Sequence, residues 1–394
     1  MMRKILFGVV VLIAVLAAAF FGLAPGIVER SMNQIAPVAL DAPSERALAL
    51  HKRVTIADLH SDTLMWKRDL LAPGKRGHMD LPRLREGNVA LQVFSSVTKT
   101  PTDQNYDSNS ADGDNITVLS VAQLQPARTW TSLLQRSLWH ASKLDSAVRR
   151  SRGALVKITT ASDVRALIET RARNESVLGA LLSVEGLHNL EGRRENLSVL
   201  FDAGYRMAGL THFFDNELAG SMHGEAKGAL TPLGRQIVED MEAKGMVVDI
   251  AHASHTAVAE ILAMATKPVV SSHGGVQAVC EVNRNLTDDE IRGVARTGGV
   301  VGIGYWDGAL CSTAPAKFVE SVVHVRDLVG IDHVGLGSDY DGATTVAFDT
   351  SRLAVLTQAL MDAGFTDDEI GKVMGGNVVR VLMQTLPAGA TASR

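Results

Sequence analysis

Eight short apolar runs, separated by longer amphipathic or polar segments, constrain the fold of this chain more than any other feature. They are rich in Val, Ile and Leu and lie at 54–59, 90–97, 180–184, 206–211, 246–251, 268–272, 300–304 and 333–337. Short apolar runs that alternate with helical segments are typical of repeated βα units around a parallel sheet. Eight such units predict a (β/α)8 barrel of the TIM type.

Helix signals lie between several of these runs. Segment 231–245 begins with Thr-Pro and ends with Gly, and 287–290 and 366–369 have the capping-box pattern. The polar segment 98–115 precedes a helix expected around 130–148, and such a long connection predicts a rim or lid of a functional site. An open doubly wound sheet is the alternative fold, but no glycine fingerprint for phosphate follows the first run.

The N-terminus has the charge pattern of an export signal or a membrane anchor. Arg3 and Lys4 precede an uncharged stretch over 5–28, and one membrane-spanning helix needs about 20 apolar residues. The two cations would stay in the cytoplasm and direct the remainder outward. No small-x-small cleavage site followed by a polar start is present, which favours an uncleaved anchor over a cleaved signal.

Residues that bind metals or transfer protons follow six of the eight runs. A barrel of this type carries its functional residues at the carboxyl ends of its strands. His60 and Asp62 follow the first run, and their spacing puts both side chains on one face of a strand. The later runs are followed by Glu185, His212, His252, His273 and Asp339. Imidazole and carboxylate ligands together suit a borderline ion such as zinc.

These residues stand in motifs that resemble the membrane dipeptidase (renal dipeptidase) family of zinc metallopeptidases. The motifs are DLHSDT at 58–63, SVEG at 183–186, LTH at 210–212, DIAH at 249–252, SH at 272–273, VNRNL at 282–286 and GSDYDG at 337–342. The resemblance covers nearly the whole body of the chain, about 51–386. It implies a barrel that hydrolyses the peptide bond of dipeptides.

The resemblance implies two zinc ions as cofactors. His60 and Asp62 would hold one ion, and His252 and His273 would hold the other. Glu185 would bridge both, together with a water or hydroxide. Two neighbouring metal ions lower the pKa of such a water towards about 7.

The resemblance also implies the catalytic and substrate-binding residues. Asp339 would act as general base and then acid, with its neighbour Asp341 as the alternative. His212 would hydrogen-bond the scissile carbonyl oxygen and stabilise the oxyanion. Arg284 would bind the free carboxylate of the substrate through its planar fork. A fixed cation one residue beyond the cleaved bond explains a preference for dipeptides, and tolerance of a D-residue at the second position follows from the family.

Other functions remain as alternatives. One is another metal-dependent amidohydrolase on the same barrel, acting on a cyclic amide, an ester or an N-acyl amino acid. Another is a non-catalytic binding protein. The His-x-Asp motif and Glu185 argue for the dipeptidase branch, because many related barrel hydrolases have His-x-His and a modified lysine instead. His223 is a further candidate for lining the pocket.

Composition and cysteines narrow the partners and the compartment. With 43 acidic and 39 basic residues and a net charge of −4, the chain lacks the basic excess of a nucleic-acid-binding protein. Cys280 and Cys311 follow the sixth and seventh runs, so their loops would be neighbours. Export permits a disulfide between them, which would stiffen the wall that carries Arg284.

The sequence thus predicts four segments. They are a signal anchor or signal peptide at 1–28, a linker and lead-in helix at 29–50, the (β/α)8 metallohydrolase domain at 51–386 and a C-terminal tail at 387–394. We expect the body to be exported to the periplasm or another extracytoplasmic space, and to be attached to the membrane if the leader is retained. Small dipeptides are the expected partners, and a homodimer is left open.

Overall fold

Eight parallel strands close into a barrel in the computed structural model, which describes residues 1–389. Around the ring the order is β3-β2-β10-β9-β8-β7-β6-β5, and pairing of β3 with β5 closes it. The strands are β2 (Ile56–Asp58), β3 (Val89–Phe94), β5 (Leu178–Glu185), β6 (Tyr205–Gly209), β7 (Val247–Asp249), β8 (Val270–Gly274), β9 (Val300–Ile303) and β10 (Val334–Leu336). Each overlaps one of the eight apolar runs, so the predicted (β/α)8 barrel is confirmed.

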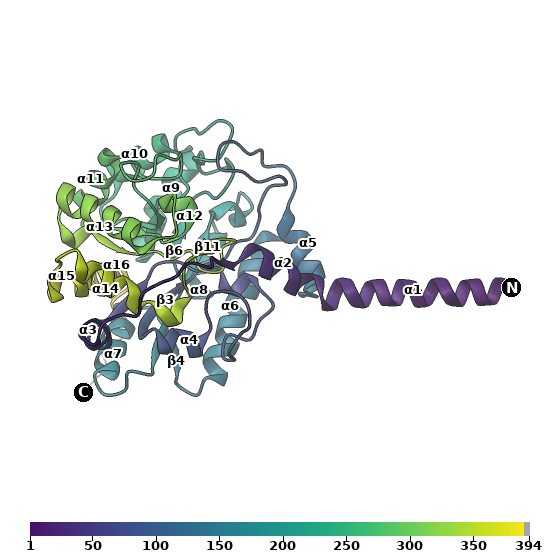
Figure 1. Ribbon diagram of the computed structural model, residues 1–394. Helices are drawn as coiled ribbons and strands as arrows, with labels where there is room; N and C mark the ends of the chain where they lie inside the picture. The colour runs from purple at the N-terminus through teal and green to yellow at the C-terminus, as the bar shows by residue number, and fades with distance from the viewer. Residues whose placement is uncertain (390–394) are drawn as a thin grey trace.

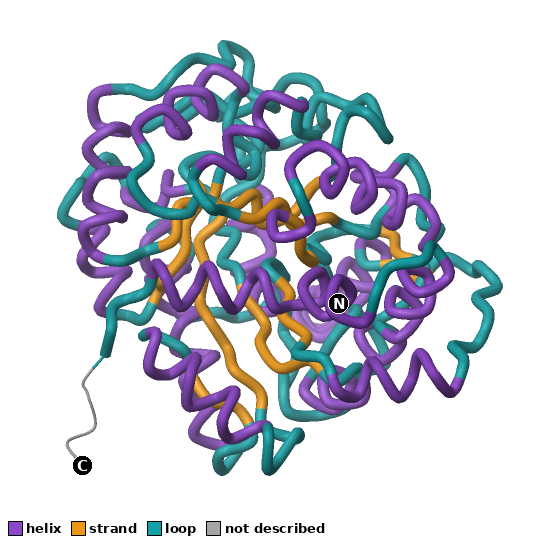
Figure 2. The backbone as a smooth tube through the Cα atoms, turned by 90° about the vertical axis from the view of Figure 1, so that its left-hand side faces the viewer, coloured by secondary structure: helices purple, strands orange, loops and turns teal. Residues whose placement is uncertain are grey.

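All residues of these eight strands are buried. Strands of a parallel sheet are covered on both faces, which is why they are continuous apolar runs instead of alternating ones. In Figure 2 the strands occupy the centre and helices surround them. The carboxyl ends of the strands therefore all open at one end of the ring, where a site can form.

Helices on the outside of the barrel connect successive strands, and α14, α15 and α16 follow the last strand. The helices are α4 (Leu81–Glu86), α5 (Asn115–Ala122), α6 (Leu133–Arg150), α7 (Ala161–Arg171), α8 (Asn196–Asp202), α9 (Pro232–Lys244), α10 (His255–Met264), α11 (Asp288–Arg296), α12 (Asp307–Leu310), α13 (Pro315–Val329), α14 (Ala354–Asp362), α15 (Asp367–Gly371) and α16 (Asn377–Thr385). The predicted caps are present: Thr231 caps α9, Gly245 ends it in the left-handed conformation, and Thr287 and Thr366 form full capping boxes.

Three further strands were not predicted. β4 (Leu155–Lys157) pairs with the first residues of β5, and β1 (Gln34–Ile35) pairs in parallel with β11 (Thr345–Val346). β1 and β11 have only two residues each, too few to form a recognisable apolar run. In β4 the two apolar residues are followed by Lys157. The pair of β1 and β11 joins the N-terminal segment to a loop that follows the last barrel strand.

The N-terminal helix α1 (Met2–Gly22) projects alone from the body, next to α2 (Ala24–Met32) and α5 (Figure 1). An 18-residue window within Met2–Met32 has a mean hydropathy of 2.9, and none of it is buried. Its length and composition suit a membrane span or a signal sequence.

The stretch 29–50, expected as a linker with a lead-in helix, has more structure than a linker. The lead-in helix is α3 (Glu45–Arg53), capped by Ser44. Before it, the end of α2 and the strand β1 pack onto the barrel, and Glu29 is only 1% exposed. Of the expected tail at 387–394, residues 390–394 lie outside the described part of the chain.

Candidate active site

The carboxyl ends of six strands bring the seven predicted metal-binding and proton-transferring residues together. All seven side chains are buried: His60, Asp62, Glu185, His212, His252, His273 and Asp339. Glu185 is the last residue of β5 and His273 lies within β8, whereas the other five follow their strands. The first and last of these residues, His60 and Asp339, are almost 280 positions apart in the sequence. They are neighbours only because the ring of strands closes.

Glu185 lies at the centre of the cluster, and its two carboxylate oxygens face different histidines. Oε2 is 3.4 Å from His60 Nε2. Oε1 is 2.8 Å from His252 Nε2 and 3.2 Å from His273 Nε2. A carboxylate that presents one oxygen to each of two nitrogen groups has the arrangement that a bridging ligand needs. His212 Nε2 lies 3.5 Å from Oε1, on the same side as His252.

The first potential metal group is His60, Asp62 and Asp339. His60 Nε2 is 3.6 Å from Asp62 Oδ1 and 4.0 Å from Asp339 Oδ1. Neither His60 Nε2 nor Asp62 Oδ1 has a hydrogen-bond partner within residues 1–389, although both atoms are buried. Buried polar atoms are nearly always paired, so two unpaired ones that face each other indicate a ligand position.

Glu185 belongs to two further potential metal groups, one with His60 and His273 and one with His212 and His252. The Nε2 atoms of His252 and His273 are 3.0 Å apart. His273 Nδ1 lies 2.8 Å from Ser272 Oγ, a contact that suits a proton on Nδ1 and leaves the Nε2 lone pair free to bind a metal. Burial lowers the pKa of His252 to about 3, so this imidazole is neutral, as a metal ligand must be.

Three carboxyl groups share this small buried volume. Burial raises the pKa of Asp339 well above its usual range, and the charges of Asp62 and Glu185 add to the effect against the opposing influence of His60. Burial also raises the pKa of Asp62, and the charge of Glu185 reinforces the shift. Close, buried carboxylates need positive charge to be stable in their ionised form. The nitrogen and oxygen donors present here fit metal ions such as zinc.

Asp58 supports the site from within the barrel, a role that the sequence did not reveal. Its carboxylate accepts hydrogen bonds from His60 N (3.1 Å), Ser338 Oγ (2.9 Å) and Tyr305 OH (2.7 Å). Ser338 Oγ also lies 2.8 Å from the carbonyl oxygen of His60. This network joins the ends of β2 and β10, so it fixes His60 relative to Asp339.

Strained and crowded backbone marks the same positions. His252 has φ 64° and Asp339 has φ 53°, in the left-handed region that side chains other than Gly rarely adopt. At Gly342, a Cβ atom would lie 2.0 Å from Asp339 Oδ1 and 2.9 Å from Asp62 Oδ2. The loop after β10 can therefore approach the two carboxylates only with glycine at position 342.

Asp341, the alternative to Asp339 as general base, forms an ion pair and hydrogen bonds with other residues. Its carboxylate forms an ion pair with Arg68 and accepts hydrogen bonds from Thr63 Oγ1 (2.7 Å) and His78 N (2.6 Å). It is fully buried and does not line the cavity, whereas Asp339 does. These contacts give Asp341 a structural role in holding the loop.

Arg284 lies on the same cavity and has unused donors. Its side chain is 5% exposed, and its guanidinium carbon is 4.6 Å from the centre of the Trp306 ring. Nε and Nη1 have no hydrogen-bond partner among the described residues. A buried cation with two free N–H groups is suited to bind an anionic group of a ligand.

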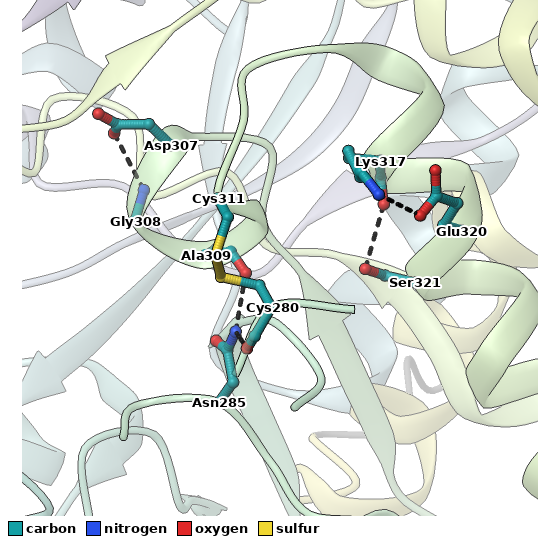
Figure 3. Close-up of a disulfide and its surroundings, with 9 residues drawn as sticks. All are labelled: Cys280, Asn285, Asp307, Gly308, Ala309, Cys311, Lys317, Glu320 and Ser321. Carbon is teal, nitrogen blue, oxygen red and sulfur yellow. Dashed lines mark hydrogen bonds and ion pairs between the residues drawn. A yellow bond between two sulfur atoms is a disulfide. The ribbon is translucent and has the colours of Figure 1, made fainter. Parts of the chain in front are cut away.

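A disulfide joins the loop after β8 to the loop after β9 (Figure 3). Cys280 and Cys311 form a disulfide, with their Cα atoms 5.6 Å apart. Beside it, Asn285 Nδ2 donates to the carbonyl oxygens of Cys280 and Ala309, each at 2.8 Å. The disulfide and these bonds hold the segment that carries Arg284 against the loop after β9.

A cavity of about 640 Å³ opens over the cluster and is lined by Asp62, Glu185, His212, His252, Arg284 and Asp339 among others. The polar segment predicted as a rim lines it too, through Thr100, Gln104 and Tyr106. His223 does not line it but holds this rim, because its Nδ1 lies 2.8 Å from the Tyr106 carbonyl oxygen. The volume suits a small organic ligand.

Comparison with known proteins gives a consistent result. The model of the family described as membrane dipeptidase (peptidase family M19) matches residues 44–393. Dipeptidase aclJ of Aspergillus oryzae is 29% identical over 362 residues, which cover 86% of this chain and 80% of that protein.

Two solved structures share the fold. The probable dipeptidase PvdM from Pseudomonas aeruginosa superposes with a TM-score of 0.73 at 19% identity, over 86% of this chain and 98% of the other. A metallo peptidase from Rhodobacter sphaeroides, liganded with a phosphinate mimic of the dipeptide L-Ala-D-Ala, gives 0.70 at 23% identity, over 84% and 99%. With the family match over most of the chain, the barrel and the cluster at its strand ends have one explanation: this chain belongs to the membrane dipeptidase family and is a metallopeptidase, a hydrolase of peptide bonds.

Proposed function

We propose that this protein is a dinuclear zinc dipeptidase for dipeptides with a free C-terminal carboxylate, and that it accepts a D-residue at the second position. The observation that carries the proposal is the position of Glu185, with one carboxylate oxygen towards His60 and the other towards His252 and His273. Arg284, with its unused donors, lines the same cavity. Metal ions held around Glu185 would activate a water, and Arg284 in the same cavity would bind the carboxylate of a dipeptide.

We propose that five side chains in this cluster hold the two metal ions. His60 and Asp62 would hold one ion, His252 and His273 the other, and Glu185 would be shared. Bound zinc would supply Lewis acidity and a water of lowered pKa. The unpaired Nε2 of His60 and Oδ1 of Asp62, and the close Nε2 atoms of the other two histidines, support this assignment.

The remaining side chains move protons and orient the substrate. Asp339 would take a proton from the attacking water and return it to the leaving amine, and its carboxylate lines the cavity together with Asp62 and Glu185. His212 lines the cavity beside Glu185, where its N–H can donate to the oxygen of the scissile carbonyl.

Arg284 would bind the C-terminal carboxylate and so set the length of the substrate. A longer peptide would have to place an uncharged amide against the guanidinium, which would leave its charge unpaired. Tolerance of a D-residue is supported by the Rhodobacter sphaeroides structure, whose ligand mimics L-Ala-D-Ala. Contacts at the carboxylate, and not at the side chain of the second residue, would then dominate binding.

The apolar helix α1 leads us to propose that the body is exported and remains attached to the membrane. Arg3 and Lys4 precede the helix, and its window of mean hydropathy 2.9 is entirely unburied. Alkaline phosphatase fused after residue 389 would be active in bacterial cells, and the protein would stay with the membrane fraction. An inactive phosphatase fusion would contradict export.

A substrate panel tests the enzymatic proposal. The full chain, purified in detergent, is assayed with L-Ala-L-Ala, L-Ala-D-Ala, L-Ala-L-Ala-L-Ala, L-alanyl-alaninamide and N-acetyl-alanine, before and after a chelator and after zinc is restored. Elemental analysis gives the zinc content per chain. We expect hydrolysis of both dipeptides, loss with the chelator, recovery with zinc, and two zinc ions per chain.

Two results would contradict the proposal. Hydrolysis of N-acetyl-alanine but of neither dipeptide would indicate the alternative amidohydrolase function. Absence of bound metal after purification without chelators would favour a non-catalytic binding protein.

A further inference from the structure

The segment that follows the apolar helix forms one wall of the active-site cavity. Phe20 in the last turn of α1, and Ala24, Pro25, Val28 and Met32 in α2, line this cavity together with Asp62 and Asp339. Val28 and Met32 are 40% and 43% exposed, so their side chains are accessible within it. The lining of the cavity thus reaches the base of α1. Figure 1 shows α2 and α5 side by side where α1 leaves the body.

A buried ion-pair network fixes this wall to the catalytic loop. Glu29 of α2 pairs with Arg68 and with Arg76, whose Nε is 2.5 Å from Glu29 Oε2. Arg68 also pairs with Asp341, two residues beyond Asp339. A carboxylate that is 1% exposed and held by two arginines is not part of a loose tether.

Backbone contacts attach the end of α2 to the same loop. Ala343 N donates to Asn33 Oδ1 at 2.9 Å, and Gln34 N donates to the carbonyl oxygen of Thr344 at 3.0 Å. The pairing of β1 with β11 continues this contact. The wall therefore keeps a fixed position relative to Gly342, which lies against the carboxylates of Asp62 and Asp339.

In the ring of eight, the strands whose loops hold the wall stand two to four places away from β8, the strand that precedes Arg284. The segments that hold α2 follow β2 and β10, and α2 also packs on α5, which follows β3. Arg284 follows β8, which stands opposite β3 in the ring of eight. A dipeptide whose carboxylate is bound by Arg284 would cross the metal-ligand cluster and point its first residue towards α2.

We infer that α2 contacts the side chain of the substrate's first residue and selects apolar side chains there. The inference rests on the proposed dipeptidase function. Val28 and Met32 provide the apolar surface, and the polar cluster lies beyond it. Transfer of a Leu or Phe side chain from water to this wall lowers the free energy of binding, whereas Gly has no side chain to transfer. The working enzyme accordingly retains α2.

The first test compares variants of the full chain in detergent. Val28→Ser combined with Met32→Ser removes apolar surface from the wall. Ile27→Ser is the matched control, because Ile27 is on the same helix, is 65% exposed and does not line the cavity. We expect the double variant to lower kcat/KM about tenfold for Leu-Gly and Phe-Gly and less than about twofold for Gly-Gly. The control variant should behave as wild type.

The second test is independent of turnover. Cys280 and Cys311 are joined, so Val28→Cys introduces a single free thiol. Its labelling by a maleimide should be slowed by a phosphinate mimic of Leu-Gly and much less by one of Gly-Gly. The mass of the purified chain should show that residues 25–32 are present.

The outcomes separate the two proposals. If wild type hydrolyses no dipeptide, the proposed function fails, and this inference with it. If dipeptides are hydrolysed but the double variant loses activity equally on Leu-Gly and Gly-Gly, or both mimics protect equally, the function stands and α2 does not read the first residue. A mature chain that starts after Met32 would also overturn the inference.

Discussion

Replacement of Arg284 by alanine should abolish the preference of the enzyme for a substrate with a free C-terminal carboxylate over the same substrate with a C-terminal amide. Arg284 is 5% exposed, and its Nε and Nη1 have no hydrogen-bond partner within residues 1–389. Each hydrogen bond between charged groups contributes about 1.5–3 kcal/mol. Two such bonds to a substrate carboxylate give about 3–6 kcal/mol, or a loss of about 10²–10⁴-fold in kcat/KM.

A thermodynamic cycle isolates this interaction. Initial rates with L-Ala-L-Ala and with L-alanyl-alaninamide are measured for wild type, Arg284→Ala and Arg284→Lys. Wild type should strongly prefer the acid, and Arg284→Ala should nearly abolish that preference. Arg284→Lys should be intermediate, because an ammonium keeps the charge but lacks the planar fork.

The comparison between the acid substrate and the amide substrate distinguishes loss of carboxylate binding from general structural damage. Arg284 packs on Trp306, so its removal also changes the packing of that wall. General damage would lower activity on both substrates by the same factor. Such an equal loss, or a loss below about tenfold on the acid, would refute the assignment of Arg284 to the carboxylate.

Three further perturbations test the site and the fold. Glu185→Gln should lower the zinc content per chain, measured by elemental analysis, because a neutral amide cannot serve as an anionic bridge; retention of wild-type zinc would contradict the bridge. Gly342→Ala should lower kcat about a hundredfold by displacing the Asp339 carboxylate, with thermal unfolding little changed; wild-type kcat would refute the close approach. Burial lowers the pKa of His51 to about 4, whereas an unfolded His has a pKa of about 6.5. Only the unfolded state then takes up this proton as the pH falls from about 6.5 to 4, so His51 costs about 3 kcal/mol of stability over that window. His51→Gln should show a shallower fall in Tm over the same range, and parallel Tm profiles would contradict the reasoning.

Local sequence pattern was sufficient for the barrel and for the positions of the residues that gather at its strand ends. Strands covered on both faces are apolar throughout, so all eight could be recognised without knowledge of their neighbours. The functional residues of a barrel stand at the strand ends, so locating the strands also located His60, Glu185 and His252. Caps such as Thr287 depend on a few adjacent residues and were predicted for the same reason.

Choices between similar residues needed the tertiary structure. Asp339 and Asp341 lie in the same motif after the last strand, and the sequence does not show which of them faces the cavity. The contacts of Asp341 with Arg68 and His78 show that Asp339 does. The sequence did not distinguish Asp58 from a surface carboxylate, because its hydrogen-bond partner Ser338 is 280 residues away along the chain. The left-handed conformation of His252 and Asp339 is likewise imposed by their surroundings.

The N-terminal segment shows most plainly which features could not be predicted from the sequence alone. Hydropathy alone indicated an apolar helix, and the residues after it had the composition of a linker. Glu29 becomes a buried residue only because Arg68 and Arg76, distant in sequence, are brought to it by the fold. Periodicity and caps are properties of neighbouring residues and can be read along the chain, whereas pairing of charges that are far apart in sequence depends on how the chain folds.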